Sequence, residues 1–242
     1  MVKRTPGHID CACVIHGNGY DWQYVEKLYN MLCRNLAAEV RMHVYTEHHR
    51  SVPPHMTKHI LDDWGITGPK RSWWYKMQLF NPAHFTGDLL YLDLDVVIAN
   101  SMNWVRDHST DYLWTMRDFR YLQRRDTTTM NSSMMWFNVS RYSWIWDQFN
   151  KQELKSTISK YPGDQDYLSA VLLPGQQRRF FEDCFFESFR WQCLDGGYDF
   201  AKRRHLKPGS GVHIQPGTSV VVFHGSPKPA EVHDPLVKRL WQ

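Results

Sequence analysis

Two aspartates within an apolar segment have the residue type and spacing that suggest chemistry most directly. The segment DLLYLDLDVVIAN (88–100) places Asp93 and Asp95 one residue apart among Leu, Tyr, Val and Ile. In an extended strand, residues i and i+2 point to the same face, roughly 6–7 Å apart, so the two carboxylates would converge. Burying two like charges is unfavourable, and a divalent cation such as Mg²⁺ or Mn²⁺ would remove that penalty. Alternatively, one aspartate caps a turn and the other pairs with a lysine or arginine.

A second candidate group follows an apolar segment near the C-terminus. The sequence VVVFHGSPKP places His224, Gly225 and Lys228 directly after four residues that favour strands. The imidazole of His224 could be a third metal ligand. Gly225 would let the backbone approach a ligand closely, and Lys228 offers a positive charge for a phosphate. An ordinary histidine at a strand end is the alternative, since the chain has 13 histidines.

These residues need elements that position them, and the hydrophobic pattern predicts alternating strands and helices. The expected strands are 11–15, 40–47, 89–98, 111–116, 132–138, 178–183 and 219–225. The expected helices are 22–38, 72–80, 142–150 and 164–173. This alternation indicates βαβ units, and therefore an α/β fold with a mostly parallel central sheet flanked by helices. Such sheets bind ligands at the carboxyl ends of their strands, where the two aspartates and His224 are expected.

Length and composition narrow the class of protein. The 242 residues are 42% hydrophobic and carry a net charge of +4, which suits a globular protein with an anionic small-molecule substrate. The basic residues are too dispersed for a nucleic-acid-binding surface. The five cysteines lack C-x-x-C spacing, which argues against a zinc cluster or a disulfide framework. With neither a signal peptide nor a transmembrane segment visible, the sequence predicts a soluble, cytoplasmic protein.

The D-x-D strand and the F-H-G-x-x-K-P segment together resemble the GT-A glycosyltransferases, particularly the glycogenin-like enzymes of the family 8 type. Four further segments agree with that family in order and approximate spacing: CVIHGNGYDWQYVEKLYNML (13–32), WWYKMQLFNPAHFTGDLLYLDLDVVI (73–98), MNSSMMWFN (130–138) and GDQDYLS (163–169). The resemblance extends over roughly residues 10–230. It departs at Ser133, where the family usually has glycine, and at Leu94, where alanine is common. Residues 176–215 match nothing in glycogenin, so the acceptor is not identified.

The resemblance implies a single GT-A domain over residues 1–242. Residues from about 10 to 100 would bind the nucleotide-sugar, and those from about 101 to 230 would bind the acceptor and supply the C-terminal motif. The implied reaction moves a sugar from a nucleotide-sugar, most often a UDP-sugar, to an acceptor hydroxyl with Mn²⁺ or Mg²⁺ as cofactor. Retention of the anomeric configuration is implied as well. The acceptor would be a glycan, a lipid-linked saccharide or a protein.

Site residues follow from the same resemblance. The expected metal ligands are Asp93, Asp95 and His224. The residues expected to bind the nucleotide-sugar are Tyr20, Lys76, Asp93, Asp95, Gly225 and Lys228, with Tyr20 stacking on uracil. The expected catalytic residues, facing the sugar and acceptor, are Asn131, Asp164 and Gln165. If the enzyme inverts instead, Asp164 or Asp166 would be the base. An N-cap of the following helix is the alternative role of Asp164.

Two other functions compete with sugar transfer. A sugar nucleotidyltransferase on a similar fold would carry a phosphate loop rich in Arg and Lys after the first strand, and HGNGYDWQ (16–23) lacks them. A catalytically silent module would bind nucleotide or carbohydrate without turnover. The presence of Asp93, Asp95, His224 and Lys228 argues against it, because an inactive relative need not keep all four.

Overall fold

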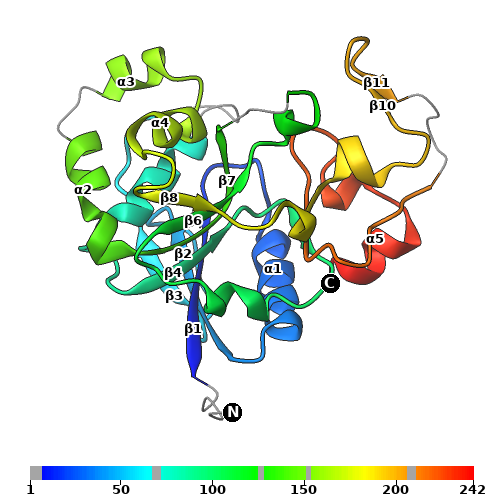
Figure 1. Ribbon diagram of the computed structural model, residues 1–242. Helices are drawn as coiled ribbons and strands as arrows, with labels where there is room; N and C mark the ends of the chain where they lie inside the picture. Colours follow the sequence, from blue (N-terminus) through cyan, green and yellow to red (C-terminus); the bar gives the residue numbers. More distant parts are fainter. Residues whose placement is uncertain (1–6, 67–71, 125–127, 151–153, 206–210) are drawn as a thin grey trace.

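The computed structural model describes residues 7–66, 72–124, 128–150, 154–205 and 211–242. Its centre is a seven-stranded sheet with the strand order β3-β2-β1-β4-β7-β6-β8 (Figure 1). The strands are β1 (His8–Ile15), β2 (Glu39–Thr46), β3 (Thr57–Ile60), β4 (Asp88–Leu92), β6 (Leu113–Arg117), β7 (Met130–Asn138) and β8 (Arg178–Phe180). Neighbouring strands pair in parallel, except that β7 is antiparallel to β4 and β6. The expected α/β fold with a mostly parallel sheet is confirmed.

Helices cover both faces of this sheet (Figure 1). Helix α1 (Trp22–Asn35) packs on one face, and η1 (Ser72–Phe80), α2 (Val139–Asn150) and α4 (Asp164–Val171) pack on the other. Strand β4 packs against helices on both faces of the sheet. Leu90 and Leu92 join the hydrophobic cluster around α1, whereas Leu89 and Tyr91 join the cluster around α2. Because side chains alternate across a strand and both faces are covered, four successive residues are large and mostly apolar.

A second, three-stranded sheet joins segments that lie far apart in the sequence. Its strands are β5 (Val96–Ile98), β12 (Val220–Val222) and β9 (Phe186–Ser188), in the order β5-β12-β9. Strand β12 is antiparallel to β5 and parallel to β9. A separate hairpin contains β10 (Tyr198–Asp199) and β11 (Arg204–His205). The second sheet places the chain that follows β12 beside the chain that precedes β5, which is the D-x-D segment.

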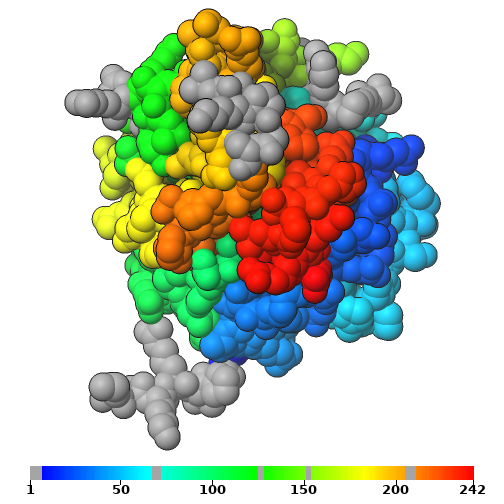
Figure 2. Space-filling model, turned by 90° about the vertical axis from the view of Figure 1, so that its right-hand side faces the viewer, coloured from blue at the N-terminus to red at the C-terminus, as the bar shows by residue number. Residues whose placement is uncertain are grey.

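The C-terminal segment returns to the N-terminal half of the fold. Figure 2 shows it (red) lying against the blue N-terminal region. Helix α5 (Pro235–Leu240) leads to Trp241, whose ring lies 3.7 Å from the Lys27 ammonium on α1. Arg34 at the end of α1 donates to the carbonyl oxygen of Gln242 at 2.8 Å.

The remaining helical segments are α3 (Leu154–Lys160), η2 (Asn103–Asp107), η3 (Phe119–Leu122), η4 (Asp183–Phe185), η5 (Phe189–Cys193) and η6 (Pro229–Glu231). Of the helices in the described ranges, none combines the length and apolar character that crossing a membrane requires.

Several expected elements differ from the structure in their bounds, and three of the differences affect the site. The strand expected at 89–98 is two strands in two sheets, because β4 ends at Leu92 and β5 begins at Val96. The backbone N–H of Asp93 still donates to the carbonyl oxygen of Ser133 at 2.8 Å, and the chain turns immediately afterwards. After the turn Asp93 is partly exposed, whereas Asp95 is buried at 8% exposure. The helix expected at 72–80 is a 3-10 helix, and the strand expected at 219–225 is shorter, 220–222.

The two-layer packing of β4 generates a test with a matched control. Leu90→Ala removes a fully buried side chain and should lower the free energy of unfolding by about 2–5 kcal/mol, because a cavity remains. Leu173→Ala makes the same change at a side chain that is 50% exposed and should alter it by less than about 0.5 kcal/mol. Urea denaturation of both variants measures the difference. Equal effects would contradict the assignment of Leu90 to the core.

Candidate active site

The D-x-D turn lies at the carboxyl-terminal edge of the central sheet. It follows β4 directly, and the parallel neighbour β1 ends at the same edge in the loop that carries Tyr20. Asp21 caps α1 after this loop by accepting a hydrogen bond from the Gln23 backbone N–H at 3.0 Å. The cap sets where Tyr20 stands, and the Tyr20 hydroxyl donates to Asp95 Oδ2 at 2.8 Å. The carboxyl-terminal edge of the sheet therefore brings together the predicted residues of both loops, at the edge where such sheets bind ligands.

Asp93 is held by a buried lysine that also holds a second carboxylate. The Lys76 ammonium lies 3.1 Å from Asp93 Oδ1 and 3.1 Å from Asp164 Oδ2, and it is 6% exposed. It also donates to Ser132 Oγ at 3.0 Å, and Ser132 Oγ donates to Asp164 Oδ2 at 2.6 Å. Burial opposes the charged form of Lys76, yet the two carboxylates raise its pKa above the ordinary value. One cation thus bridges Asp93 and Asp164.

Asp95 is held by a lysine from the C-terminal motif. The Lys228 ammonium donates to Asp95 Oδ2 and also to the carbonyl oxygen of Phe223, the latter at 3.3 Å. The Phe223 backbone N–H donates to the carbonyl oxygen of Asp95 at 3.1 Å, which joins the two segments through the backbone as well. Burial, and then the charge of Asp93, raise the pKa of the Asp95 carboxyl above its ordinary value. The charge of Asp93 therefore opposes the ionisation of Asp95 even though Asp95 has a lysine partner.

The two carboxylates fit a divalent cation. Asp93 Oδ1 and Asp95 Oδ2 carry the lysine and tyrosine contacts, and no residue of the described ranges donates to Asp93 Oδ2 or Asp95 Oδ1. Mg²⁺ and Mn²⁺ are typically bound through one or two carboxylates, with phosphate and water oxygens completing the coordination. The described part of the chain contains no group of three or more His, Cys, Asp and Glu side chains arranged to hold a metal ion. The two carboxylates thus fit an ion whose remaining ligands come from the phosphates of a substrate and from water.

His224 follows β12, but its imidazole is engaged elsewhere in this structure. Its Nε2 is 2.6 Å from Ser188 Oγ, its ring stacks on Phe119, and Trp191 packs against it edge-on with ring centroids 4.5 Å apart. Burial lowers the pKa of His224 to about 4, so the ring is neutral at pH 7, which is the form that binds metals. The structure does not gather His224 with the two aspartates into a metal-binding group, and its role as third ligand stays a prediction.

The three predicted catalytic residues have different surroundings. Asp164 is 4% exposed, and its carboxylate binds Lys76 and Ser132; Gly163, not Asp164, is the N-cap of α4. Gln165 donates through Nε2 to Asp118 Oδ2 at 2.5 Å.

Asn131 lies on β7 beside an irregularity in its pairing with β6 and accepts the Ser133 backbone N–H at 2.8 Å. Among the described residues, Asp164 is the one of the three that is joined to the Asp93 carboxylate through side chains, by way of Lys76; Asn131 is linked to Asp93 through the Ser133 backbone.

Sequence reasoning missed several residues around this site. Asp118 is buried after β6 and accepts bonds from Gln165 and from the Arg120 side chain. The signal that could have found it is the one that found Asp93, an acidic residue that directly follows an apolar strand. Ser188 and Trp191, which surround His224, come from the part of the sequence that matches nothing in glycogenin, and no local pattern marks them.

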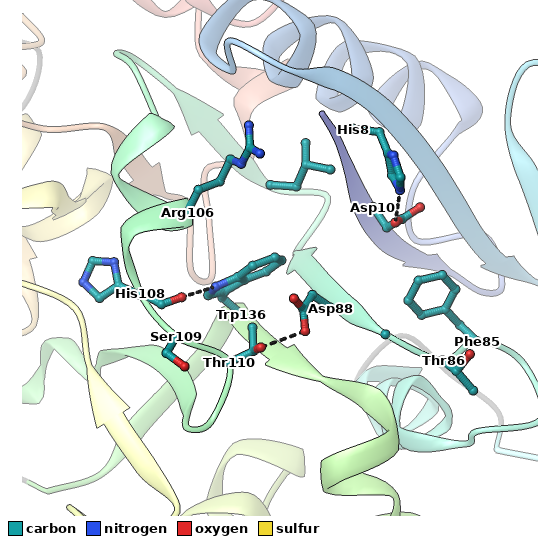
Figure 3. Close-up of a pocket in the computed structure, with 12 residues that line it drawn as sticks. His8, Asp10, Phe85, Thr86, Asp88, Arg106, His108, Ser109, Thr110 and Trp136 are labelled. Atoms are coloured by element: carbon teal, nitrogen blue, oxygen red, sulfur yellow. Dashed lines mark hydrogen bonds and ion pairs between the residues drawn. The ribbon is translucent and has the colours of Figure 1, made fainter. Parts of the chain in front are cut away.

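Two cavities of the described structure lie away from this site. One of about 650 Å³ opens where β1 and β4 begin, at the opposite end of these strands from the D-x-D turn (Figure 3). Its acidic groups already have partners: Asp88 Oδ1 accepts from Thr110 Oγ1 at 2.7 Å, and Asp10 lies 2.9 Å from the His43 imidazole. A neighbouring cavity of about 680 Å³ shares Asp10 and His43. Because these two aspartates are already bound to protein side chains, the D-x-D edge is the better candidate for the active site.

Comparison with known proteins identifies the fold. No protein-family model matches the sequence, and no curated protein sequence matches it significantly. Solved structures do match. The galactosyltransferase LgtC in complex with donor and acceptor sugar analogues superposes with a TM-score of 0.61 at 13% identity, over 96% of this chain and 94% of that one. The glycosyltransferase GlyE of Streptococcus pneumoniae TIGR4 has a TM-score of 0.64 at 13% identity, over 96% of this chain and 60% of that one.

A third match is the bifunctional glycosyltransferase WbbM, with a TM-score of 0.60 at 12% identity, over 96% of this chain and 51% of that one. At such low identity these similarities establish the fold, and each covers nearly all of this chain. The resemblance to the glycogenin-like, family 8 enzymes in particular stays a prediction. The protein has the GT-A fold of known glycosyltransferases.

Proposed function

We propose that this protein is a glycosyltransferase that moves a sugar from a nucleotide-sugar, a UDP-sugar, to an acceptor hydroxyl with Mn²⁺ or Mg²⁺. The observation that carries this proposal is the pair Asp93 and Asp95 at the end of β4. Each carboxylate has one oxygen bound by a lysine and one without a donor in the described structure. The GT-A fold supports the proposal, because LgtC, which shares it, was solved with donor and acceptor sugar analogues.

The reaction requires stabilisation of a departing nucleoside diphosphate. When bound, the divalent cation would neutralise negative charge that develops on the phosphate oxygens. Asp93 and Asp95 would hold that cation, and Lys228, which already lies at Asp95, would donate to a phosphate. Tyr20 orients Asp95 through its hydroxyl, and its stacking on uracil remains part of the proposal. Lys76 acts one step further away by holding Asp93 and Asp164 in place.

The contacts of Asp164 bear on the stereochemistry. Its Oδ2 accepts hydrogen bonds from both Lys76 and Ser132, so this oxygen is already engaged and is poorly placed to take the proton of an acceptor hydroxyl. We therefore propose retention of the anomeric configuration, with Asp164 as a positioning residue and with Gln165 and Asn131 facing the sugar. Asp166, in the first turn of α4, is the candidate base of an inverting reaction. We further propose that the acceptor hydroxyl belongs to a glycan, a lipid-linked saccharide or a protein. A cytoplasmic location is also part of the proposal.

No specific observation favours a nucleotidyltransferase. Arg50 does approach the loop after β1, donating to the carbonyl oxygen of Gly17 at 2.7 Å. Its charge is already paired with Glu47 at 3.1 Å, so it is not the uncompensated cation that a phosphate loop presents. A catalytically silent module remains the second candidate, and turnover separates it from an enzyme.

Lys76→Met tests the bridge between Asp93 and Asp164. It leaves two buried carboxylates uncompensated and should lower the free energy of unfolding by about 3–5 kcal/mol at pH 7. Burial already raises the pKa of Asp164, and losing the cation raises it further, so the folded variant takes up protons more readily than the unfolded chain. The deficit relative to wild type should therefore shrink as the pH falls from 7 to 5.

Denaturant titrations at both pH values measure this effect. Adding Asp164→Asn should restore part of the loss at pH 7, whereas Lys238→Met, at an exposed lysine of α5, should change little. A deficit that is independent of pH would contradict the electrostatic explanation.

Thermal denaturation tests the metal and the donor together. UDP at 100 times its dissociation constant should stabilise the protein by about 2.7 kcal/mol, which raises Tm by roughly 5–10 °C. This shift should require Mn²⁺, should be absent with UMP and should be lost in Asp95→Asn. Asp111→Asn, at an exposed aspartate, should keep it. If no nucleoside diphosphate gives a metal-dependent shift, the proposed function is wrong.

Turnover separates an enzyme from a silent binder. Incubation with Mn²⁺ and a panel of UDP-sugars should release UDP slowly by hydrolysis without an acceptor, and the productive sugar names the donor. Asp95→Asn should reduce the rate by at least about 100-fold, since it removes charge stabilisation at the leaving group. Metal-dependent UDP binding without UDP release from any donor would favour the silent module. Release of pyrophosphate from UTP and a sugar 1-phosphate would instead indicate a nucleotidyltransferase.

A further inference from the structure

Arg190 is a cation at the candidate site that neither the sequence pattern nor the resemblance points to. It lies on η5, a turn of π-helix that directly follows β9. Strand β9 is parallel to β12, with Ser188 opposite Val222, so both chains leave the sheet at the same edge. The residues that follow are Arg190 on one side and His224 and Gly225 on the other. Single turns of π-helix occur frequently at functional sites, and this one adjoins the C-terminal motif.

The side chain of Arg190 reaches the backbone of that motif. Its Nη1 atom is 3.7 Å from the position that a Cβ atom would occupy at Gly225. Gly225 has a φ of +78°, which side-chain-bearing residues rarely adopt. The guanidinium therefore faces an open stretch of backbone. Its neighbour Trp191 packs on the His224 ring, which fixes the direction in which η5 leaves β9.

The charge of Arg190 has no acidic partner in the described ranges. Its guanidinium carbon lies over the aromatic ring of Tyr198, 5.3 Å from the ring centroid. Lys228, the lysine of the same motif, is by contrast bound to Asp95. A cation without a counterion, beside a glycine that admits close approach, is suited to an anionic ligand. A guanidinium is further suited to phosphate, because its planar donors match two oxygens at once.

We propose that Arg190 binds the terminal phosphate of the nucleoside diphosphate, next to Gly225. This inference rests on the proposed function and adds a residue to it. Asp93 and Asp95 would hold the cation, and Arg190 would contact the phosphate that carries the sugar. Arg190 lies within 176–215, which matches nothing in glycogenin, so the resemblance does not assign it a role.

The test compares diphosphate with monophosphate binding. Isothermal titration in Mn²⁺ should show that Arg190→Gln weakens UDP binding by at least about tenfold, whereas UMP binding, which lacks the terminal phosphate, changes less than about twofold. Arg190→Lys should recover part of the UDP affinity. The matched control is Arg179→Gln, because Arg179 also lies over a tyrosine ring, that of Tyr112 at 3.7 Å, but beside the start of β6. It should leave both affinities unchanged.

The outcomes separate this inference from the function on which it rests. If wild type binds UDP with Mn²⁺ and Arg190→Gln binds it equally well, Arg190 is not a phosphate ligand and the proposed function still stands. A parallel loss of UDP and UMP binding would show that Arg190 only shapes the fold and would overturn the inference. If wild type binds no nucleoside diphosphate in the presence of Mn²⁺, the proposed function fails first and Arg190 loses its ligand with it.

Discussion

The structure depends on how two acidic side chains are accommodated at the edge of an apolar sheet. Asp93 and Asp95 follow β4, whose side chains pack in the hydrophobic core. The charge of Asp93 opposes the ionisation of the neighbouring Asp95 carboxyl. Lys76 from η1 and Lys228 from the C-terminal motif each contact one carboxylate. These compensating charges come from segments that lie far apart in the sequence. Removing either would leave an acid without its cation, so the site and the fold around it stabilise each other.

This constraint explains the arrangement of the second sheet. Because the chain turns at Asp93, β5 leaves the central sheet and pairs with β12, which places Phe223 and Lys228 next to Asp95. Strand β9 then adds to β12 and brings the segment from Ser188 to Trp191 around His224. The candidate site is thus built by tertiary pairing between segments that are remote in sequence. Asp93 Oδ2 and Asp95 Oδ1, which accept no hydrogen bond from the described residues, are the oxygens that this pairing leaves available to a ligand.

The sequence predicted the acids and the cations of the site but not their pairing. Asp93 and Asp95 stand out because charges directly after an apolar strand are unusual, Lys228 stands out as a cation between two prolines, and Lys76 was found through the resemblance. That Lys76 would bridge to Asp164, or that the Tyr20 hydroxyl would bind Asp95, depends on strand order, which no local pattern encodes. The alternating pattern predicted the α/β class, yet it merged β4 and β5 because their apolar residues are continuous across the turn. Ser188 and Arg190 carried no signal, since their role follows from β9 joining β12.

The central claim is that Asp93 and Asp95 hold a divalent cation together with a nucleoside diphosphate. Anomalous diffraction from crystals grown with Mn²⁺ and UDP tests it most directly, because manganese is located independently of any assumption about the site. The account predicts one strong anomalous peak in contact with a carboxylate oxygen of each aspartate and with phosphate oxygens of UDP. UDP bound at this edge without a manganese peak between the aspartates, or manganese bound only elsewhere, would contradict it.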